Sequence, residues 1–224
     1  MQSIKNAAAV SALAVASLVL AGCASASAPD LSPTPTEAPE QSAATAEEME
    51  LPELIETTPI SVDEYVAAFG DATGWSGVAG VQEEYRQAAA SFPLPLPDGY
   101  GFPADLEVYE DPDEPDAQWE AGNGTVQAFF FWSGATATAA YAAHERGDAE
   151  TAANYLDIFE EGWASPVRSM YVDPESPGAD SPYILHALPA ARGGNFDTML
   201  EVDIYPFLDN PANRAIATAA GDIV

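Results

Sequence analysis

The fold is decided by residues 123–166, NGTVQAFFFWSGATATAAYAAHERGDAETAANYLDIFEEGWASP. Two runs of apolar side chains at helical spacing flank Gly147 and Asp148, which are typical of a helix stop followed by an N-cap. The pattern predicts a helix over about 124–146 and a second helix that ends before Pro166, together an αα-hairpin. The apolar faces comprise Val126, Phe129, Phe130, Ala137, Ala140, Tyr141 and His144 in the first helix and Ala152, Tyr155, Leu156, Phe159 and Trp163 in the second.

Residues 125–132 also allow a different interpretation, because aromatic side chains favour strands. Gly134 would then separate a strand from a shorter helix. Residues 196–208 are similarly ambiguous, and Pro206 is expected to break that segment. We expect a mainly α single domain with a central αα-hairpin; the alternative is an α+β domain with a small sheet that includes residues 125–132 and 197–205.

Upstream of the hairpin, two further helices are predicted. Ser61 and Glu64 form a capping-box pattern before a short helix that Gly70 ends, with Ile60 and Tyr65 as a hydrophobic staple. A second helix is predicted over about 77–90. Its inward positions are Val78, Val81 and Tyr85, and its outward positions are Glu83, Glu84 and Arg86.

The remaining segments of the domain give weaker patterns. Residues 92–97 alternate apolar residues with proline, which predicts an extended strap across the core, and residues 98–101 predict a turn. Residues 183–188 form a short apolar element. Asn210 and Pro211 predict the start of a terminal helix that ends near Gly221.

The amino terminus has the pattern of an export signal. Lys5 precedes an apolar run over residues 7–20, which is shorter than the roughly 20 residues that a membrane span needs. The sequence Leu20-Ala21-Gly22-Cys23 follows, and Cys23 is the single cysteine of the chain, so no internal disulfide can form.

Leu20 to Cys23 resembles the lipobox of bacterial lipoprotein precursors. The resemblance implies that residues 1–22 are a lipoprotein signal peptide, that a diacylglyceryl group joins the Cys23 thiol, and that the mature chain begins at this lipidated cysteine. The expected location is therefore the extracytoplasmic face of the cell membrane. The alternative is an ordinary secretory signal in which Cys23 occurs by chance.

Residues 23–58 are predicted to be a disordered tether, and residues 59–224 a single globular domain of unknown function. From residue 24 to residue 58 there are five prolines, eight acidic residues, no aromatic residue and no basic residue. Such a composition buries too little apolar surface to offset the entropy of ordering.

The charge of the chain excludes one class of partner. The 36 acidic and six basic residues give a formal net charge of −30, and a nucleic-acid surface needs clustered Lys and Arg. We therefore expect no nucleic-acid partner and no basic patch that attracts lipid. The expected partners are the membrane through lipidated Cys23, and an envelope protein or a small ligand.

Residues 92–166 resemble uncharacterised actinobacterial envelope lipoproteins in the order of their features: a Gly-x-Gly, an aromatic run, a tryptophan, a helix and a Gly-Asp pair. This resemblance implies an envelope location and no particular activity.

Catalytic patterns are incomplete. Ser133, in Trp-Ser-Gly, partly resembles a nucleophile elbow, for which His144 or His186 would be the base. Ser76 has a similar but also incomplete setting. No complete triad pattern is present, so the sequence favours a non-enzymatic binding or interaction module; a cell-surface serine hydrolase that uses Ser133 with His144 or His186 is the alternative.

No cofactor is expected. The two histidines lie far from each other and from the cysteine in sequence, which argues against a zinc site. Seven carboxylates lie within residues 107–120, but their spacing departs from that of calcium-binding EF-hand loops. A solvated loop is the favoured interpretation. The weaker alternative is a calcium site formed by Asp111, Asp113, Glu114 and Asp116.

Overall fold

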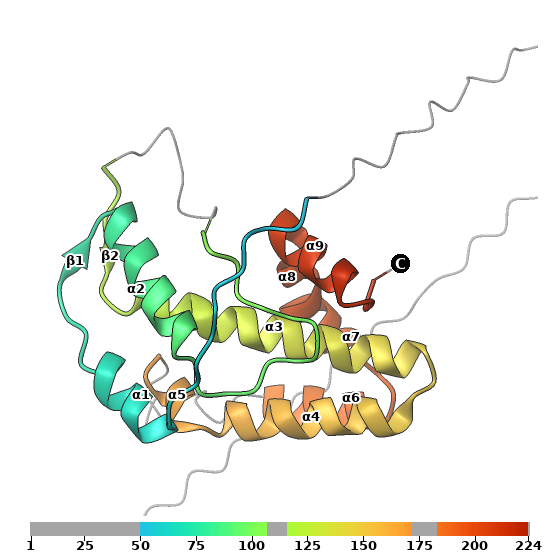
Figure 1. Cartoon of the computed structure of the whole chain (residues 1–224). Helices are drawn as coiled ribbons and strands as arrows, with labels where there is room; N and C mark the ends of the chain where they lie inside the picture. Colours follow the sequence, from blue (N-terminus) through green and yellow to red (C-terminus); the bar gives the residue numbers. More distant parts are fainter. Residues whose placement is uncertain (1–49, 107–115, 172–182, 224) are drawn as a thin grey trace, which may run out of the picture. The chain divides into compact units, whose positions relative to one another are not determined.

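The computed structural model describes residues 50–106, 116–171 and 183–223, and helices dominate this part of the chain (Figure 1). The α-helices are α1 (Val62–Phe69), α2 (Val78–Ala90), α3 (Asn123–Glu145), α4 (Ala149–Trp163), α5 (Pro166–Ser169), α6 (Leu188–Arg192), α7 (Asp197–Met199), α8 (Tyr205–Asp209) and α9 (Pro211–Ala219). Two π-helical turns are η2 (Tyr183–Ala187) and η3 (Leu200–Ile204). β1 (Trp75–Ser76) pairs antiparallel with β2 (Trp119–Glu120). The mainly α domain with a central αα-hairpin is confirmed.

The α+β alternative is wrong on both segments. Residues 125–132 belong to α3, whose residues 131–140 are all buried, and a helix surrounded by other elements is apolar around its whole circumference. Residues 197–205 are helical because their buried positions, Met199, Ile204 and then Phe207, are spaced by five and three, which does not match the alternation of a strand. Pro206 does not break the segment, since it lies in the first turn of α8, where no backbone N–H is needed.

The hairpin is closed by the two residues that the sequence indicated. Gly147 has a φ of 77°, which an L side chain rarely adopts. The Asp148 carboxylate then accepts hydrogen bonds from Thr151 N at 3.1 Å and Thr151 Oγ1 at 2.7 Å, which caps α4. Figure 1 shows α3 and α4 antiparallel and side by side, and they are in extensive contact.

Glycine permits two close approaches to α3. At Gly162 of α4, a Cβ would overlap the six-membered ring of Trp132 on α3. Gly134, which the alternative interpretation treated as a break, lies in the middle of α3, where a Cβ would meet Phe207 at 2.6 Å. The Trp132 indole of α3 therefore packs on the backbone of α4 at Gly162, and the Phe207 ring packs on the backbone of α3 at Gly134.

The first two helices begin where predicted, with one correction. The Ser61–Glu64 capping box is present in α1, and Gly77 is the N-cap of α2. Glu84, however, does not face outward. Its carboxylate accepts hydrogen bonds from Gly122 N, Thr125 N and Thr125 Oγ1 at 2.8–3.1 Å, and so caps the amino terminus of α3.

The strap over residues 92–97 is confirmed. Phe92 is fully buried and Leu94 and Leu96 are partly buried against the same core. The Trp132 indole N–H donates to Pro95 O at 2.9 Å, which fastens the strap to α3. Asn210 caps α9 as predicted, accepting from Asn213 N at 3.1 Å.

The predicted tether boundary at Thr58 is too late in the chain. Ile55 N donates to Phe102 O, Ala104 N donates to Glu53 O and Thr58 N donates to Ala90 O, with distances of 2.7–2.8 Å. Residues 53–58 are therefore part of the folded domain. Their composition resembles that of a tether, but backbone hydrogen bonds to distant segments and the partly buried side chain of Ile55 hold them to the domain.

Within the described ranges, no helix is both long enough and apolar enough to cross a membrane. The predicted signal peptide over residues 1–22 and Cys23 lie outside those ranges, as does the predicted tether before residue 50.

Candidate functional site

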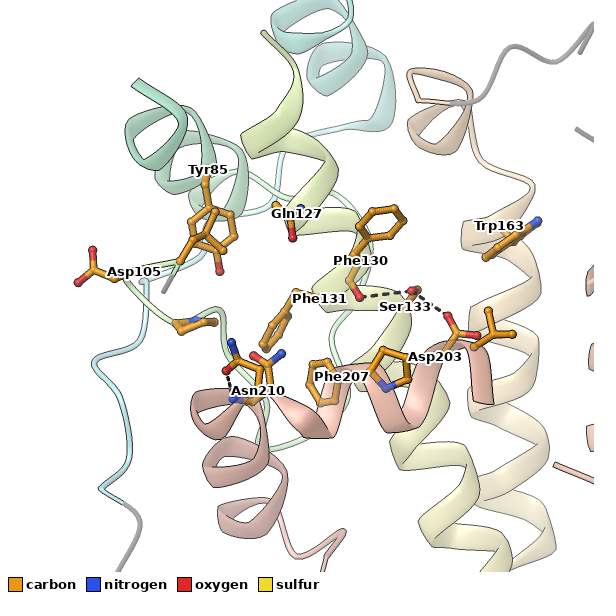
Figure 2. Close-up of a pocket in the computed structure, with 15 residues that line it drawn as sticks. Tyr85, Asp105, Gln127, Phe130, Phe131, Ser133, Trp163, Asp203, Phe207 and Asn210 are labelled. Atoms are coloured by element: carbon orange, nitrogen blue, oxygen red, sulfur yellow. Dashed lines mark hydrogen bonds between the residues drawn. The ribbon is translucent and has the colours of Figure 1, made fainter. Parts of the chain in front are cut away.

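A cavity of about 400 Å³ lies along one side of α3 (Figure 2). Its walls come from α2, the segment at residues 103–106, α3, η3, α8 and the start of α9, and Trp163 lies at one end. The residues that line it are Tyr85, Pro103, Asp105, Leu106, Gln127, Phe130, Phe131, Ser133, Trp163, Val202, Asp203, Pro206, Phe207, Asn210 and Asn213. A volume of this order is typical of small-ligand sites.

The base of the cavity is aromatic and rigid. Phe131 packs edge to face on Phe207 with ring centroids 5.3 Å apart, and both rings are buried. Because Gly134 has no side chain, the Phe207 ring packs directly on the backbone of α3 there. These rings form a preorganised apolar surface that a ligand can contact without rearrangement of the core.

The mouth of the cavity exposes apolar side chains to solvent. Phe130 is 57% exposed and Val202 is 53% exposed, although both are large and apolar. Removing a solvated ring beside an apolar cavity from water is favourable, so a partner that covers this ring is stabilised there.

One buried polar group faces this apolar site. The Tyr85 side chain is 0% exposed, and its hydroxyl has no hydrogen-bond partner among the residues that the structure describes. Figure 2 shows the hydroxyl directed into the cavity, toward Phe131 and Asn210. Burial, reinforced by the carboxylate of Asp105, raises the pKa of Tyr85 well above its ordinary value. The phenol is therefore neutral and available as a hydrogen-bond donor.

Ser133 lines the cavity but not as a nucleophile elbow. It lies within α3 and is 4% exposed, and its Oγ is 3.2 Å from Asp203 Oδ1 and 3.3 Å from Phe130 O. A nucleophile elbow requires a strand-to-helix turn. A serine in the middle of a helix, whose hydroxyl hydrogen-bonds to a carboxylate and a backbone carbonyl, lacks that geometry.

The structure does not bring either histidine to Ser133. His144 is eleven residues further along α3, about 16 Å at about 1.5 Å per residue. Its ring packs on Phe196 with centroids 5.1 Å apart, on another part of the domain. His186 is an exposed residue of η2, and no hydrogen bond joins it to Ser133 within the described chain.

The charged residues on the lining of the cavity are Asp105 and Asp203, and both are engaged. The Arg168 guanidinium lies 4.5 Å from the ring centroid of Trp163. Asp105 forms an ion pair with Arg86, which also donates to Ala104 O at 3.0 Å. Asp203 accepts from Ser133. No arginine lines the cavity. Elsewhere Arg146 pairs with Asp222, and Arg192 with Asp157 and Glu160.

The predicted alternative metal site lies mostly outside the described residues, since only Asp116 of its four carboxylates falls within them. Within the described ranges, no cluster of three or more His, Cys, Asp or Glu side chains could hold a metal ion.

The helical pattern of residues 77–90 predicts a core position for Tyr85 but gives no indication of the cavity. One feature of the sequence does indicate an exposed aromatic ring: Phe129 to Trp132 are four consecutive aromatic residues. On a helix with 3.6 residues per turn, four consecutive side chains point in all directions. The four rings therefore cannot all face the core. Phe130, which is predicted to lie on the apolar face of the helix, is the one that faces solvent.

No protein family, curated protein or solved structure matches this chain.

Proposed function

We propose that this protein is a lipid-anchored envelope lipoprotein whose domain is a non-enzymatic binding module, with the α3 cavity as its ligand site. The observation that supports this most strongly is the combination of a cavity of about 400 Å³ with the 57% exposed ring of Phe130 at its mouth. Burial of apolar area at about 25 cal/mol per Å² would favour an apolar ligand there.

Binding is favoured over catalysis by the arrangement around Ser133. Serine-dependent acyl transfer needs a base within hydrogen-bond reach of the nucleophile. The neighbours of Ser133 Oγ are a carboxylate and a backbone carbonyl, and His144 is about 16 Å away along α3. The serine is better explained as a residue that fixes Asp203 of η3 against α3.

The anchor rests on the order of features at the amino terminus: Lys5, an apolar run and the lipobox-like Leu20 to Cys23. In this proposal the lipidated cysteine holds the protein at the extracytoplasmic face of the cell membrane. The tether extends from the anchor to the first described hydrogen bonds, at residues 53–58.

Titration with the neutral fluorescent probe N-phenyl-1-naphthylamine tests the ligand site. Every sample carries Cys23→Ala, which removes the acylation site and the need for detergent. The protein is expected to increase the fluorescence of the probe, and Phe130→Glu is expected to weaken binding at least tenfold by placing a charge at the mouth of the cavity.

Trp75→Glu is the matched control. Trp75 is an exposed aromatic residue, 70% exposed, but it lies in β1 and does not line the cavity. Its substitution should leave probe binding unchanged. Equal losses for both variants, or no binding by the parent protein, would contradict the proposed site.

Cys23→Ala tests the anchor separately. We expect the parent protein to sediment with membranes and the Cys23→Ala protein to appear in the medium. Continued membrane retention of the variant would refute the predicted lipid attachment without bearing on the ligand site.

A further inference from the structure

Two tyrosine hydroxyls are buried without a hydrogen-bond partner among the described residues, those of Tyr65 and Tyr85. Both side chains are 0% exposed, and both contribute to the same core cluster. They differ in one respect: Tyr85 lines the α3 cavity and Tyr65 does not. Only the Tyr85 hydroxyl is therefore placed to meet a ligand.

The Tyr65 side chain instead packs within the core. Its ring packs against Phe69 and Phe92, with centroids 4.8 Å and 5.6 Å away. Burial and the nearby Tyr171 raise the pKa of Tyr65, but the Tyr171 hydroxyl donates to Thr125 O at 3.1 Å. Tyr65 is thus a buried phenol that does not line the cavity, and it serves as the control for Tyr85.

An unpaired buried hydroxyl is unfavourable, since it gave up water on folding and gained nothing in return. A phenylalanine at position 85 would fill the same space without that loss. A ligand that presents an acceptor atom to the Tyr85 hydroxyl would remove the cost, and such a contact is worth more in an apolar setting than in water.

The charges around the cavity restrict the ligand further. An anionic head group placed against the apolar rings would lose its hydration, and no arginine lines the cavity to pair with it. A cationic ligand would have to compete with Arg86 for Asp105, and Asp203 already accepts from Ser133. A neutral ligand meets neither obstacle.

We propose that the α3 cavity binds a neutral apolar molecule that carries a carbonyl-type oxygen, with its apolar body against Phe130, Phe131 and Phe207 and its oxygen accepting a hydrogen bond from the Tyr85 hydroxyl. This inference rests on the proposed function, because it specifies the ligand class of the same site. Tyr85 is its polar anchor, and the aromatic rings give it affinity.

Three ten-carbon probes that differ in their head groups test the ligand class: 1-monodecanoylglycerol, which is neutral and has an ester carbonyl, decanoate, and decyltrimethylammonium. Each displaces N-phenyl-1-naphthylamine from the Cys23→Ala protein at concentrations below micelle formation. The monoglyceride is expected to bind at least tenfold more tightly than either charged probe.

Tyr85→Phe and Tyr65→Phe test the anchor. The first should weaken monoglyceride binding about tenfold. The second, at a position that does not line the cavity, should leave the binding of the monoglyceride and of N-phenyl-1-naphthylamine within about twofold. Thermal unfolding of both variants checks that they fold, and removal of an unpaired hydroxyl is expected to leave the melting temperature equal or higher.

The outcomes separate this inference from the proposed function. If N-phenyl-1-naphthylamine binds and responds to Phe130→Glu, but the monoglyceride binds no better than the charged probes or is insensitive to Tyr85→Phe, the ligand class proposed here is wrong and the binding site remains. If no probe binds the parent protein, both proposals fail.

Discussion

Helix α3 has two aromatic sides that differ in what covers them. On the α4 side Trp132 is 0% exposed, stacks on Phe159 with centroids 5.9 Å apart and fits the space left by Gly162. On the cavity side Phe130, two residues earlier, is 57% exposed. The first side stabilises the fold, and the second retains apolar surface that nothing in the described chain covers. Aromatic residues two positions apart on one helix can therefore differ in role, one within the core and one at the surface that we propose as a ligand site.

Alanine substitution of the two aromatic residues should show the largest difference. Trp132→Ala leaves a cavity in the core and removes the hydrogen bond to Pro95 O, so we expect a loss of about 3–5 kcal/mol in the free energy of unfolding. Phe130→Ala removes a solvated ring and should cost about 1 kcal/mol or less. Urea denaturation measures both, and similar losses would contradict the comparison.

The packing of Trp132 on α4 can also be disrupted by a substitution in α4. Gly162→Ala places a Cβ within the buried Trp132 ring. Overpacking of this kind lowers the free energy of unfolding by up to about 3 kcal/mol. The higher helix propensity of alanine relative to glycine offsets about 1 kcal/mol of that loss. A net loss of about 2 kcal/mol is expected in urea denaturation. Glu161→Ala, at the exposed neighbouring position, should change stability by about 0.5 kcal/mol or less.

Both sides of α3 depend on its amino-terminal cap. Glu84→Ala removes the acceptor of three hydrogen bonds from Gly122 and Thr125, and should cost about 2 kcal/mol. Glu84→Gln keeps an acceptor without the charge and should cost about 1 kcal/mol. Glu83→Ala is the exposed control. If Glu84→Ala unfolds no more easily than this control, the cap is not a determinant of the position of α3.

The smallest expected effect concerns the hairpin turn and pH. Hydrogen bonds from Thr151 lower the pKa of Asp148 below its ordinary value. A lowered pKa in the folded state means that the contribution is present above the unfolded pKa and is lost as pH falls through the folded value. Asp148→Ala should therefore be less stable than the parent protein at neutral pH, with a difference that shrinks below about pH 4. A difference that is constant with pH would show that the charge of the cap is irrelevant.

The sequence was sufficient for the features that depend on local chemistry. The hairpin follows from Gly147 and Asp148, and the capping box of α1 follows from Ser61 and Glu64, because each interaction joins residues a few positions apart. The terminal helix begins at Asn210 for the same reason.

Features that join distant segments could not be predicted in this way. Glu84 caps a helix whose first hydrogen-bonded residue lies 38 positions away, so its role exists only once α2 packs on α3. The cavity brings together Tyr85 and Phe207, which lie far apart in the sequence. Composition alone predicts that residues 53–58 belong to the tether, because it gives no indication of their backbone pairing with residues 102–104.

Intermolecular NOEs locate a bound ligand directly, and they test whether the uncovered side of α3 is its binding site. In a complex of the Cys23→Ala protein with N-phenyl-1-naphthylamine, we predict NOEs from the probe to the ring protons of Phe130, Phe131 and Phe207. NOEs to Trp75 or to other exposed apolar residues, with none to these three rings, would contradict the account.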